Sequence, residues 1–200
     1  MIILYIFLCL LLGYIVGSIP VALVLGKTFR GVDIREHGSH NLGATNAGRV
    51  LGRKYFFAVM ILDAIKGALP IVLARVCHLA DHLGIVETLC AVAVIIGHSK
   101  PIFLQFKGGK SVASGVGTIL ALNWIAGIII ALIWGTITYI SKYVSLGSII
   151  ALGLSPFIMF FLKSPIGYVI YCAIAGVYII YLHRENIKRL IKGEENKVRN

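Results

Sequence analysis

Long, almost unbroken runs of apolar residues most strongly constrain what this chain can fold into. The first run, "MIILYIFLCLLLGYIVG", contains no charged residue, and similar runs recur as far as residue 182. A helix needs about 20 apolar residues to cross ~30 Å of hydrocarbon. The runs therefore predict membrane-spanning helices. The mean hydropathy of +0.92 and a charged fraction of only 14% agree with this prediction.

Seven spans are predicted, with boundaries at 2–25, 55–76, 84–98, 111–122, 125–141, 146–162 and 166–182. The fourth span is short, and little chain separates it from the fifth. A single helix over the 31 residues from Ser111 to Ser141 would be ~46 Å long at about 1.5 Å per residue, which is too long for one span. A hairpin turning at Asn123 is therefore favoured. The N-terminal run has no basic segment before it, so we expect a retained helix and not a cleaved signal peptide.

Lysine and arginine residues predict the orientation of these spans. With the N-terminus outside, the inner segments 26–54, 99–110, 142–145 and the tail from 183 hold 16 of the 19 basic residues. Because basic loops remain cytoplasmic, the C-terminus is expected inside the cell. This bias also explains the net charge of +11 without nucleic-acid binding, since no soluble basic domain is present. The sequence predicts an all-α integral membrane protein forming one domain over 1–200.

Three polar clusters fall at the predicted inner membrane edge, and two serines in "KYVSLGS" (142–148) lie at the same level. The clusters are "GSHNLGATNAGRVLGRK" (38–54), "GHSKPIFLQFKGGKSVASG" (97–115) and "HRENIKRLIKGEE" (183–195). The predicted outer loops contain nothing comparable. The cysteines are interpreted as small apolar residues and not as disulfides or metal ligands, because they lie in apolar runs without a CxxC motif. They are Cys9, Cys77, Cys90 and Cys172.

The "KGGK" stretch at 107–110 has the composition of a phosphate-binding turn. Gly108 and Gly109 allow backbone N–H groups to point into one concavity, with Lys110 expected to begin the helix 111–122. The spacing is not that of a P-loop, so a nucleotide is not implied. A plain turn with its lysines at the lipid headgroups explains this fragment equally well.

Other polar residues allow a functional and a structural interpretation. Arg49 could bind phosphate in bidentate fashion, or the loop before it could be only a capped re-entrant segment. His183 and Asn186 are three residues apart, hence on one helical face, but a histidine at a span's end is often merely interfacial. Asp63 and Lys66 lie inside the second span, where ionisable groups form structural ion pairs or serve function.

Six stretches together resemble the bacterial acyl-phosphate-dependent glycerol-3-phosphate acyltransferases, in order and over nearly the whole chain. They are "GSIP" (17–20), "DIREHGSHNLGATNAGRVLG" (33–52), "DAIKG" (63–67), "GHSKPIFLQFKGGKSVAS" (97–114), "SLGS" (145–148) and "HRENIKRLIKGEE" (183–195). His40, Leu42, Ser111 and Ser114 depart from the usual family residues.

The resemblance implies a multi-pass enzyme of the bacterial plasma (inner) membrane whose active site faces the cytoplasm. It would transfer a fatty acyl group from acyl phosphate to the sn-1 hydroxyl of glycerol 3-phosphate, giving lysophosphatidic acid and phosphate. No metal or other cofactor is expected. The expected partners are acyl phosphate, glycerol 3-phosphate and membrane lipid, with no nucleic acid. The HxxxxD motif of the other acyltransferase class is absent from the sequence.

The resemblance also assigns the site. Catalysis is expected of Ser39, His183 and Asn186, and substrate binding of Asn41, Thr45, Asn46, Arg49, Gly108, Gly109, Lys110 and Ser148. The base is either His183 or the phosphate of the donor. A transporter of a phosphorylated solute is the alternative function, although transporters usually place such sites near the midplane of internal repeats, and no repeat is visible here.

Overall fold

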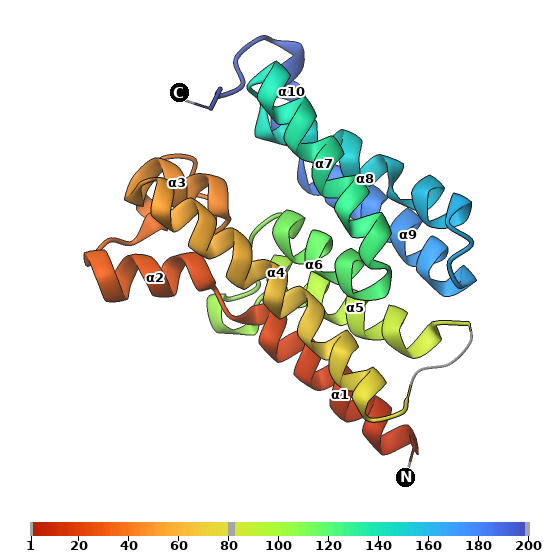
Figure 1. Ribbon diagram of the computed structural model, residues 1–200. Helices are drawn as coiled ribbons and strands as arrows, with labels where there is room; N and C mark the ends of the chain where they lie inside the picture. Colours follow the sequence, from red (N-terminus) through yellow and green to blue (C-terminus); the bar gives the residue numbers. More distant parts are fainter. Residues whose placement is uncertain (1, 80–82, 199–200) are drawn as a thin grey trace.

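The computed structural model describes residues 2–79 and 83–198, and these residues form helices and no β-strand, as predicted. Figure 1 shows the helices in one elongated bundle. The α-helices are α1 (Ile2–Ser18), α2 (Val21–Arg30), α3 (Ala44–Leu51), α4 (Arg53–Val76), α5 (Ile85–Ser99), α6 (Val112–Leu122), α7 (Trp124–Ser141), α8 (Val144–Phe161), α9 (Ile166–Leu182) and α10 (Arg184–Ile191). Two short 3₁₀ turns, η1 (Ile34–Glu36) and η2 (Ile102–Leu104), lie in the loops.

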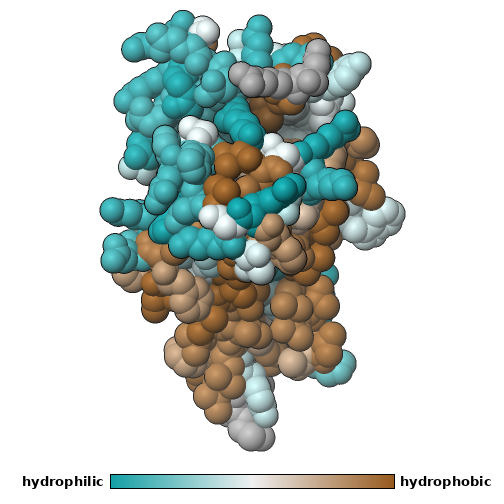
Figure 2. Space-filling model, turned by 90° about the vertical axis from the view of Figure 1, so that its left-hand side faces the viewer, coloured by the Kyte–Doolittle hydropathy of each residue, from teal (hydrophilic) through white to brown (hydrophobic). Residues whose placement is uncertain are grey.

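The molecule has the character of an integral membrane protein. Four helical segments are long and apolar enough to cross a membrane: α4, α5 with η2, α7 and α8. The count of spans rises to six if the bent pairs α1–α2 and α9–α10 each form one, and α6 is a shorter apolar helix. Figure 2 shows a hydrophilic end above a largely hydrophobic body. The N-terminus lies at one end of the bundle and the C-terminus at the other (Figure 1).

The predicted continuous first span, 2–25, is wrong. Helix α1 ends at Ser18, and α2 begins at Val21 after a bend of 44°. Pro20 causes the break, because proline has no N–H to donate and disfavours helical geometry at the residue before it, Ile19. Helix α2 then leaves the direction of α1 and carries Lys27 and Arg30 in its last turn.

The predicted hairpin at Asn123 is confirmed. Helix α6 ends at Leu122 and α7 begins at Trp124. The side-chain oxygen of Asn123 accepts hydrogen bonds from the N–H groups of Ile125 and Ala126, each at 3.1 Å. It thereby satisfies two N–H groups that have no partner within the first turn of α7. The other predicted helices, from the second to the seventh, are confirmed to within two residues at each end.

Small residues allow the helices to approach closely. Gly17 in α1 lies against the backbone of Val94 in α5, and Gly117 in α6 lies against the backbone of Ala64 in α4. A Cβ atom at either glycine would overlap those backbone atoms. Such contacts replace the hydrophobic driving force that is missing between helices in lipid. Cys9, Cys90 and Cys172 are buried as predicted, whereas Cys77 is exposed, and none of the four forms a disulfide.

Candidate active site

A cavity of about 730 Å³ lies between the polar loops and the helices α4, α6 and α7. Most of the residues predicted for the site line it: Ser39, Asn41, Thr45, Asn46, Arg49, Lys110, Ser148, His183 and Asn186. They come from segments that are far apart in the sequence. The bundle brings them together because the polar loops, α10 and the tail lie at the same end of the molecule. Gly108 and Gly109 do not line this cavity.

The loop from 38 to 46 uses many of its polar groups to hold its own shape. The amide nitrogen of Asn46 donates to the carbonyl oxygens of Ile34 (2.9 Å) and His37 (3.1 Å), and its oxygen accepts from the N–H of Ser39 at 2.7 Å. Asn41 accepts from the N–H of Gly43 at 3.0 Å. Asn46 is only 1% exposed. Its amide is thus already paired, so it shapes the wall of the cavity by fixing the loop.

Three cations and one carboxylate gather at the polar end of the cavity. Lys110 donates to the side-chain oxygen of Asn186, and Arg49 donates to the backbone carbonyl of Asn196 at 3.3 Å. Arg189 lies 2.7 Å from Glu195, whose carboxylate also accepts from Ser145 (2.8 Å) and Asn186 (2.6 Å). Within this group the positive charges exceed the negative ones. Asp63 and Glu185 also line the cavity, but each is paired with a lysine, Lys66 (2.8 Å) and Lys188 (3.2 Å) respectively. This end of the cavity therefore suits an anion.

Burial and neighbouring charges shift the protonation of this cluster. Burial, with the charges of Arg189 and Arg49, lowers the pKa of Lys110 to about 8, although the charge of Glu195 acts in the opposite direction. Burial alone would raise the pKa of the Glu195 carboxyl, but hydrogen bonds from Asn186, Ser145 and Arg189 hold it below its ordinary value. Glu195 is therefore ionised at neutral pH. Lys110 is protonated there but loses its proton more readily than a solvated lysine.

His183 lies at the end of α9 with one ring nitrogen engaged. Its Nδ1 lies 2.8 Å from the carbonyl oxygen of Ile179, and since a carbonyl only accepts, Nδ1 carries the proton and donates. Burial lowers the pKa of His183 to about 4, with Lys110 contributing, although the hydrogen bond to Ile179 and the charge of Glu195 act in the opposite direction. The ring is therefore neutral at pH 7, and Nε2 is an acceptor.

The predicted helical relation of His183 and Asn186 is wrong in one respect. His183 terminates α9, and α10 starts at Arg184 after a bend of 60°. The two side chains nevertheless both line the cavity. His183 also begins the first turn of α10, because its carbonyl accepts from the N–H of Ile187 at 2.9 Å, and Asn186 follows it by three residues in that turn.

The predicted nest of free N–H groups in "KGGK" is also wrong. The N–H of Gly108 donates to the carbonyl of Ser99 and that of Gly109 to the carbonyl of His98, both at 3.1 Å. Lys110 does not begin a helix either, because Ser111 has a φ of +59° and α6 starts at Val112. The glycines act as close-packing residues, since a Cβ at Gly108 or Gly109 would overlap His98.

The remainder of the cavity is apolar. Helices α4, α6 and α7 contribute Phe56, Met60, Ile61, Val116, Leu120, Ala131 and Trp134. The indole N–H of Trp134 donates to the hydroxyl oxygen of Ser148 at 3.2 Å, and that hydroxyl donates to the carbonyl of Val144 at 2.8 Å. Ser148 thus lies where the apolar and polar linings meet. One cavity can hold both a charged headgroup and a hydrocarbon chain.

Sequence reasoning missed several residues of the cavity lining, among them Ser145, Arg189 and Glu195. They lie in the stretches "SLGS" and "HRENIKRLIKGEE" that were singled out, but neither charge nor spacing distinguished them. The basic tail also holds Glu185 and Glu194, so acidic character alone could not single out Glu195. Within residues 2–79 and 83–198, no group of three or more His, Cys, Asp or Glu side chains is placed to hold a metal ion.

Comparison with known proteins connects this geometry to an activity. A family model described as glycerol-3-phosphate acyltransferase matches residues 7–193. A glycerol-3-phosphate acyltransferase of Gloeobacter violaceus is 38% identical, with 93% of this chain and 91% of that protein covered.

Two solved structures share the fold of this chain. Both are crystal structures of PlsY (YgiH), an integral membrane glycerol 3-phosphate acyltransferase. The glycerol 3-phosphate form superposes with a TM-score of 0.91 at 36% identity, covering 98% of this chain and 96% of the other. The lysophosphatidic acid form gives 0.89 at 35% identity, with the same coverage.

Proposed function

The chain belongs to the glycerol-3-phosphate acyltransferase family, and we propose that its acyl donor is acyl phosphate. It is an integral membrane acyltransferase that acylates glycerol 3-phosphate in phospholipid synthesis. The proposed reaction joins the acyl group to the sn-1 hydroxyl and releases lysophosphatidic acid and inorganic phosphate. Family membership sets aside the alternative of a transporter for phosphorylated solutes.

One observation carries the proposal about the site: a single cavity joins a cationic end to an apolar region. Both proposed substrates bear a phosphate, and the donor also bears a hydrocarbon chain. We assign the phosphate of glycerol 3-phosphate to Lys110 and Arg49, with Asn41 and Thr45 beside it. The fatty chain lies along α4, α6 and α7. Ser39, Ser148 and Asn186 orient the hydroxyl and the acyl carbonyl.

The proposed chemistry needs no cofactor because acyl phosphate is already an activated mixed anhydride. The sn-1 oxygen attacks the acyl carbon, a new C–O bond forms, and the bond from that carbon to the phosphate oxygen breaks. Negative charge develops on the carbonyl oxygen, where a preorganised donor is typically worth ~10²–10³ in rate. Ser39 and Asn186 are the polar side chains that we assign to this task.

The proton of the attacking hydroxyl needs an acceptor. His183 offers an unprotonated Nε2, but its pKa of about 4 makes it a weak base. A phosphate ester with a second pKa of about 6 holds a proton more strongly. We therefore propose that the departing phosphate takes the proton, while Nε2 of His183 accepts a hydrogen bond from the hydroxyl and orients it.

The proposed membrane arrangement has seven spans in a single domain over 1–200. The four long spans, the two bent pairs and α6 add up to seven crossings. An odd number agrees with termini at opposite ends of the bundle (Figure 1). The 16 basic residues of the inner segments support an external N-terminus, a cytoplasmic C-terminus and a site facing the cytoplasm of a bacterial inner membrane.

Cysteine labelling tests this topology. Asn41→Cys and Lys197→Cys, each in a background without the four native cysteines, should react with an impermeant thiol reagent only from the cytoplasmic side. Both positions lie at the polar end of the molecule. Reaction of either cysteine from outside intact cells would overturn the proposed orientation.

Donor specificity is tested with purified protein in detergent or lipid. Acyl phosphate and glycerol 3-phosphate should yield lysophosphatidic acid and phosphate in equal amounts, whereas acyl-CoA should not replace the donor. Product formation with acyl-CoA as the only acyl donor would contradict acyl phosphate as the donor. The assignment of the chain to its family would remain valid.

A further inference from the structure

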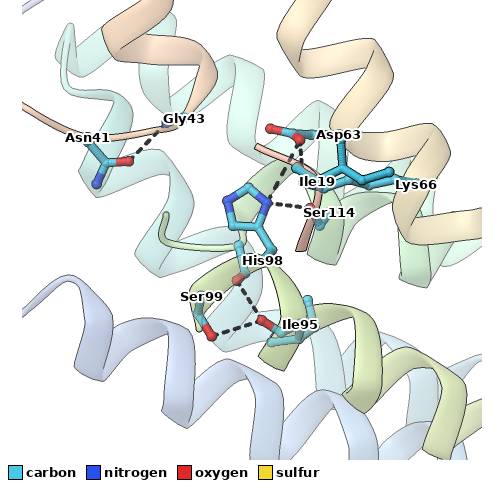
Figure 3. A network of polar contacts seen from close by, with 10 residues as sticks. Ile19, Asn41, Gly43, Asp63, Lys66, Ile95, His98, Ser99 and Ser114 are labelled. Atoms are coloured by element: carbon cyan, nitrogen blue, oxygen red, sulfur yellow. Dashed lines mark hydrogen bonds and ion pairs between the residues drawn. The ribbon is translucent and has the colours of Figure 1, made fainter. Parts of the chain in front are cut away.

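A buried polar network lies outside the predicted site, although two of its members, Asp63 and His98, line the cavity. Lys66 Nζ is 2.8 Å from Asp63 Oδ1, so the two residues form the ion pair that their spacing suggested. The same ammonium donates to the carbonyl oxygen of Ile19 at 2.8 Å, at the break between α1 and α2 (Figure 3). Neither residue is more than 6% exposed. The pair thereby ties α4 to the broken first span.

His98, near the end of α5, joins this network. Its Nδ1 is 3.0 Å from Ser114 Oγ in α6 and 3.8 Å from Asp63 Oδ1 (Figure 3). Both neighbours approach the same ring nitrogen. A serine–histidine–aspartate relay requires them on opposite nitrogens, so this trio is not a nucleophilic triad. Ser114 is also fully buried. The contacts instead fix the orientation of the ring.

The oriented ring supports the turn that precedes Lys110. The carbonyl of His98 accepts the N–H of Gly109, and Nε2 lies so close to Gly109 that a Cβ there would overlap it. The next residue, Lys110, reaches into the cavity and donates to Asn186. Lysine is a flexible point charge, so the placement of its backbone decides where the ammonium can reach.

We propose that His98 is a positioning residue for glycerol 3-phosphate binding, which holds the Gly108–Gly109 turn so that Lys110 meets the substrate phosphate. The inference rests on the proposed role of Lys110 in the site. Ser114 and the Asp63–Lys66 pair fix the ring, the ring and the carbonyl of His98 fix the turn, and the turn places Lys110. Misplacing a binding group by about 1 Å can cost on the order of 10²-fold in rate.

Two substitutions at His98 and one control test this proposal. His98→Leu removes the polar contact with Ser114 and Asp63, whereas His98→Asn keeps a polar atom near the position of Nδ1. Ser99→Ala is the matched control: it removes the hydrogen bonds of the Ser99 hydroxyl with Tyr178 and Ile95 but leaves the Ser99 carbonyl that accepts from Gly108. KM for glycerol 3-phosphate and kcat are measured for each as a function of pH.

The expected result is a change in KM and in its pH dependence. KM should rise by about ten-fold or more in His98→Leu, by less in His98→Asn, and stay near the parent value in Ser99→Ala. Lys110 is faced by Arg49, Arg189, Glu195 and His183. If it moves towards solvent, its pKa rises above about 8, and the loss of affinity at alkaline pH should shift upward.

A merely structural role predicts a different outcome. Less folded protein would lower the apparent kcat while KM and its pH dependence stayed at the parent values, in both His98 variants, and that result would overturn the proposal. His98→Asn keeps the test valid if His98→Leu does not fold. Parent protein that makes no product from glycerol 3-phosphate would instead refute the proposed function, so the two failures are distinguishable.

Discussion

Two charged clusters lie at opposite ends of this molecule, and their partners differ. At the end that the proposed orientation places outside, here called the outer end, Arg75 of α4 donates to Glu87 (3.4 Å) and Tyr168 (3.0 Å). It also donates to the carbonyls of Ala121 and Leu122 at the end of α6. Tyr168 donates to Glu87 at 2.8 Å. One guanidinium thus joins four helices, and Arg75 does not line the 730 Å³ cavity.

At the opposite end, which the proposed orientation places inside and which is here called the inner end, three cations line the cavity and form a hydrogen-bonded cluster with one carboxylate. The cations are Lys110, Arg49 and Arg189. The one carboxylate that forms hydrogen bonds within the cluster is that of Glu195. The comparison separates two uses of a cation in a membrane protein. A cation that donates to several helices of its own chain holds those helices together, whereas an excess of cations in a hydrogen-bonded cluster at a cavity calls for an external anion.

The largest expected effect belongs to the inner cluster. Lys110→Ala should lower kcat/KM for glycerol 3-phosphate by at least about 30-fold, or roughly 2 kcal/mol, because a charge-assisted contact disappears from a partly dry site. Lys107 is the matched control, since its side chain is exposed three residues past the end of η2. Lys107→Ala should change the same ratio by less than about five-fold. Equal losses in folded protein would mean that the inner end is only a general basic surface.

A smaller effect on KM for glycerol 3-phosphate is expected from a change in pH. Burial lowers the pKa of Lys110 to about 8, so its charge is present below pH 8 and is lost as the pH rises further. KM for glycerol 3-phosphate should therefore be flat up to about pH 8 and then rise, by at most about ten-fold per pH unit for a single proton. Lys110→Arg should abolish this rise, because arginine stays charged. A rise that persists unchanged in Lys110→Arg would assign it to another group.

The smallest effect on substrate binding is expected at the outer cluster. Arg75→Met should leave KM for glycerol 3-phosphate within about two-fold of the parent while lowering Tm. Two carbonyls lose their donor, and Glu87 loses its cation and keeps only the hydroxyl of Tyr168, at a cost of about 1–3 kcal/mol. Steady-state kinetics give KM, and thermal unfolding of the same preparation gives Tm. An increase of KM comparable to that of Lys110→Ala would remove the distinction between the two clusters.

The helices could be predicted from sequence, whereas the breaks between them could not all be foreseen. Apolar runs located α4 to α9, because a membrane-spanning helix requires a long run of apolar residues in the sequence. Asn123 indicated a turn, because asparagine is a common helix N-cap. The bend at Pro20 was missed since the apolar run continues through it. The bend at His183 was missed because a polar helix follows directly.

The polar lining of the site could be located, but the partners of its residues could not. Inner loops lie at one level, so Ser39, Arg49, Lys110 and His183 were expected near one another, and all line the cavity. The carbonyl to which a backbone N–H donates is set by tertiary packing. The hydrogen bond from the N–H of Gly109 to the carbonyl of His98 was therefore not predictable. The folding of Glu195 onto Asn186 and Arg189 likewise depends on tertiary contacts.

A structure of this protein with glycerol 3-phosphate bound tests the central claim most directly, namely that the inner cations bind the substrate phosphate. The phosphate oxygens should lie within hydrogen-bonding distance, about 3 Å, of the Lys110 ammonium and the Arg49 guanidinium. The glycerol hydroxyls should then point towards His183. A phosphate bound away from both Lys110 and Arg49 would contradict the account.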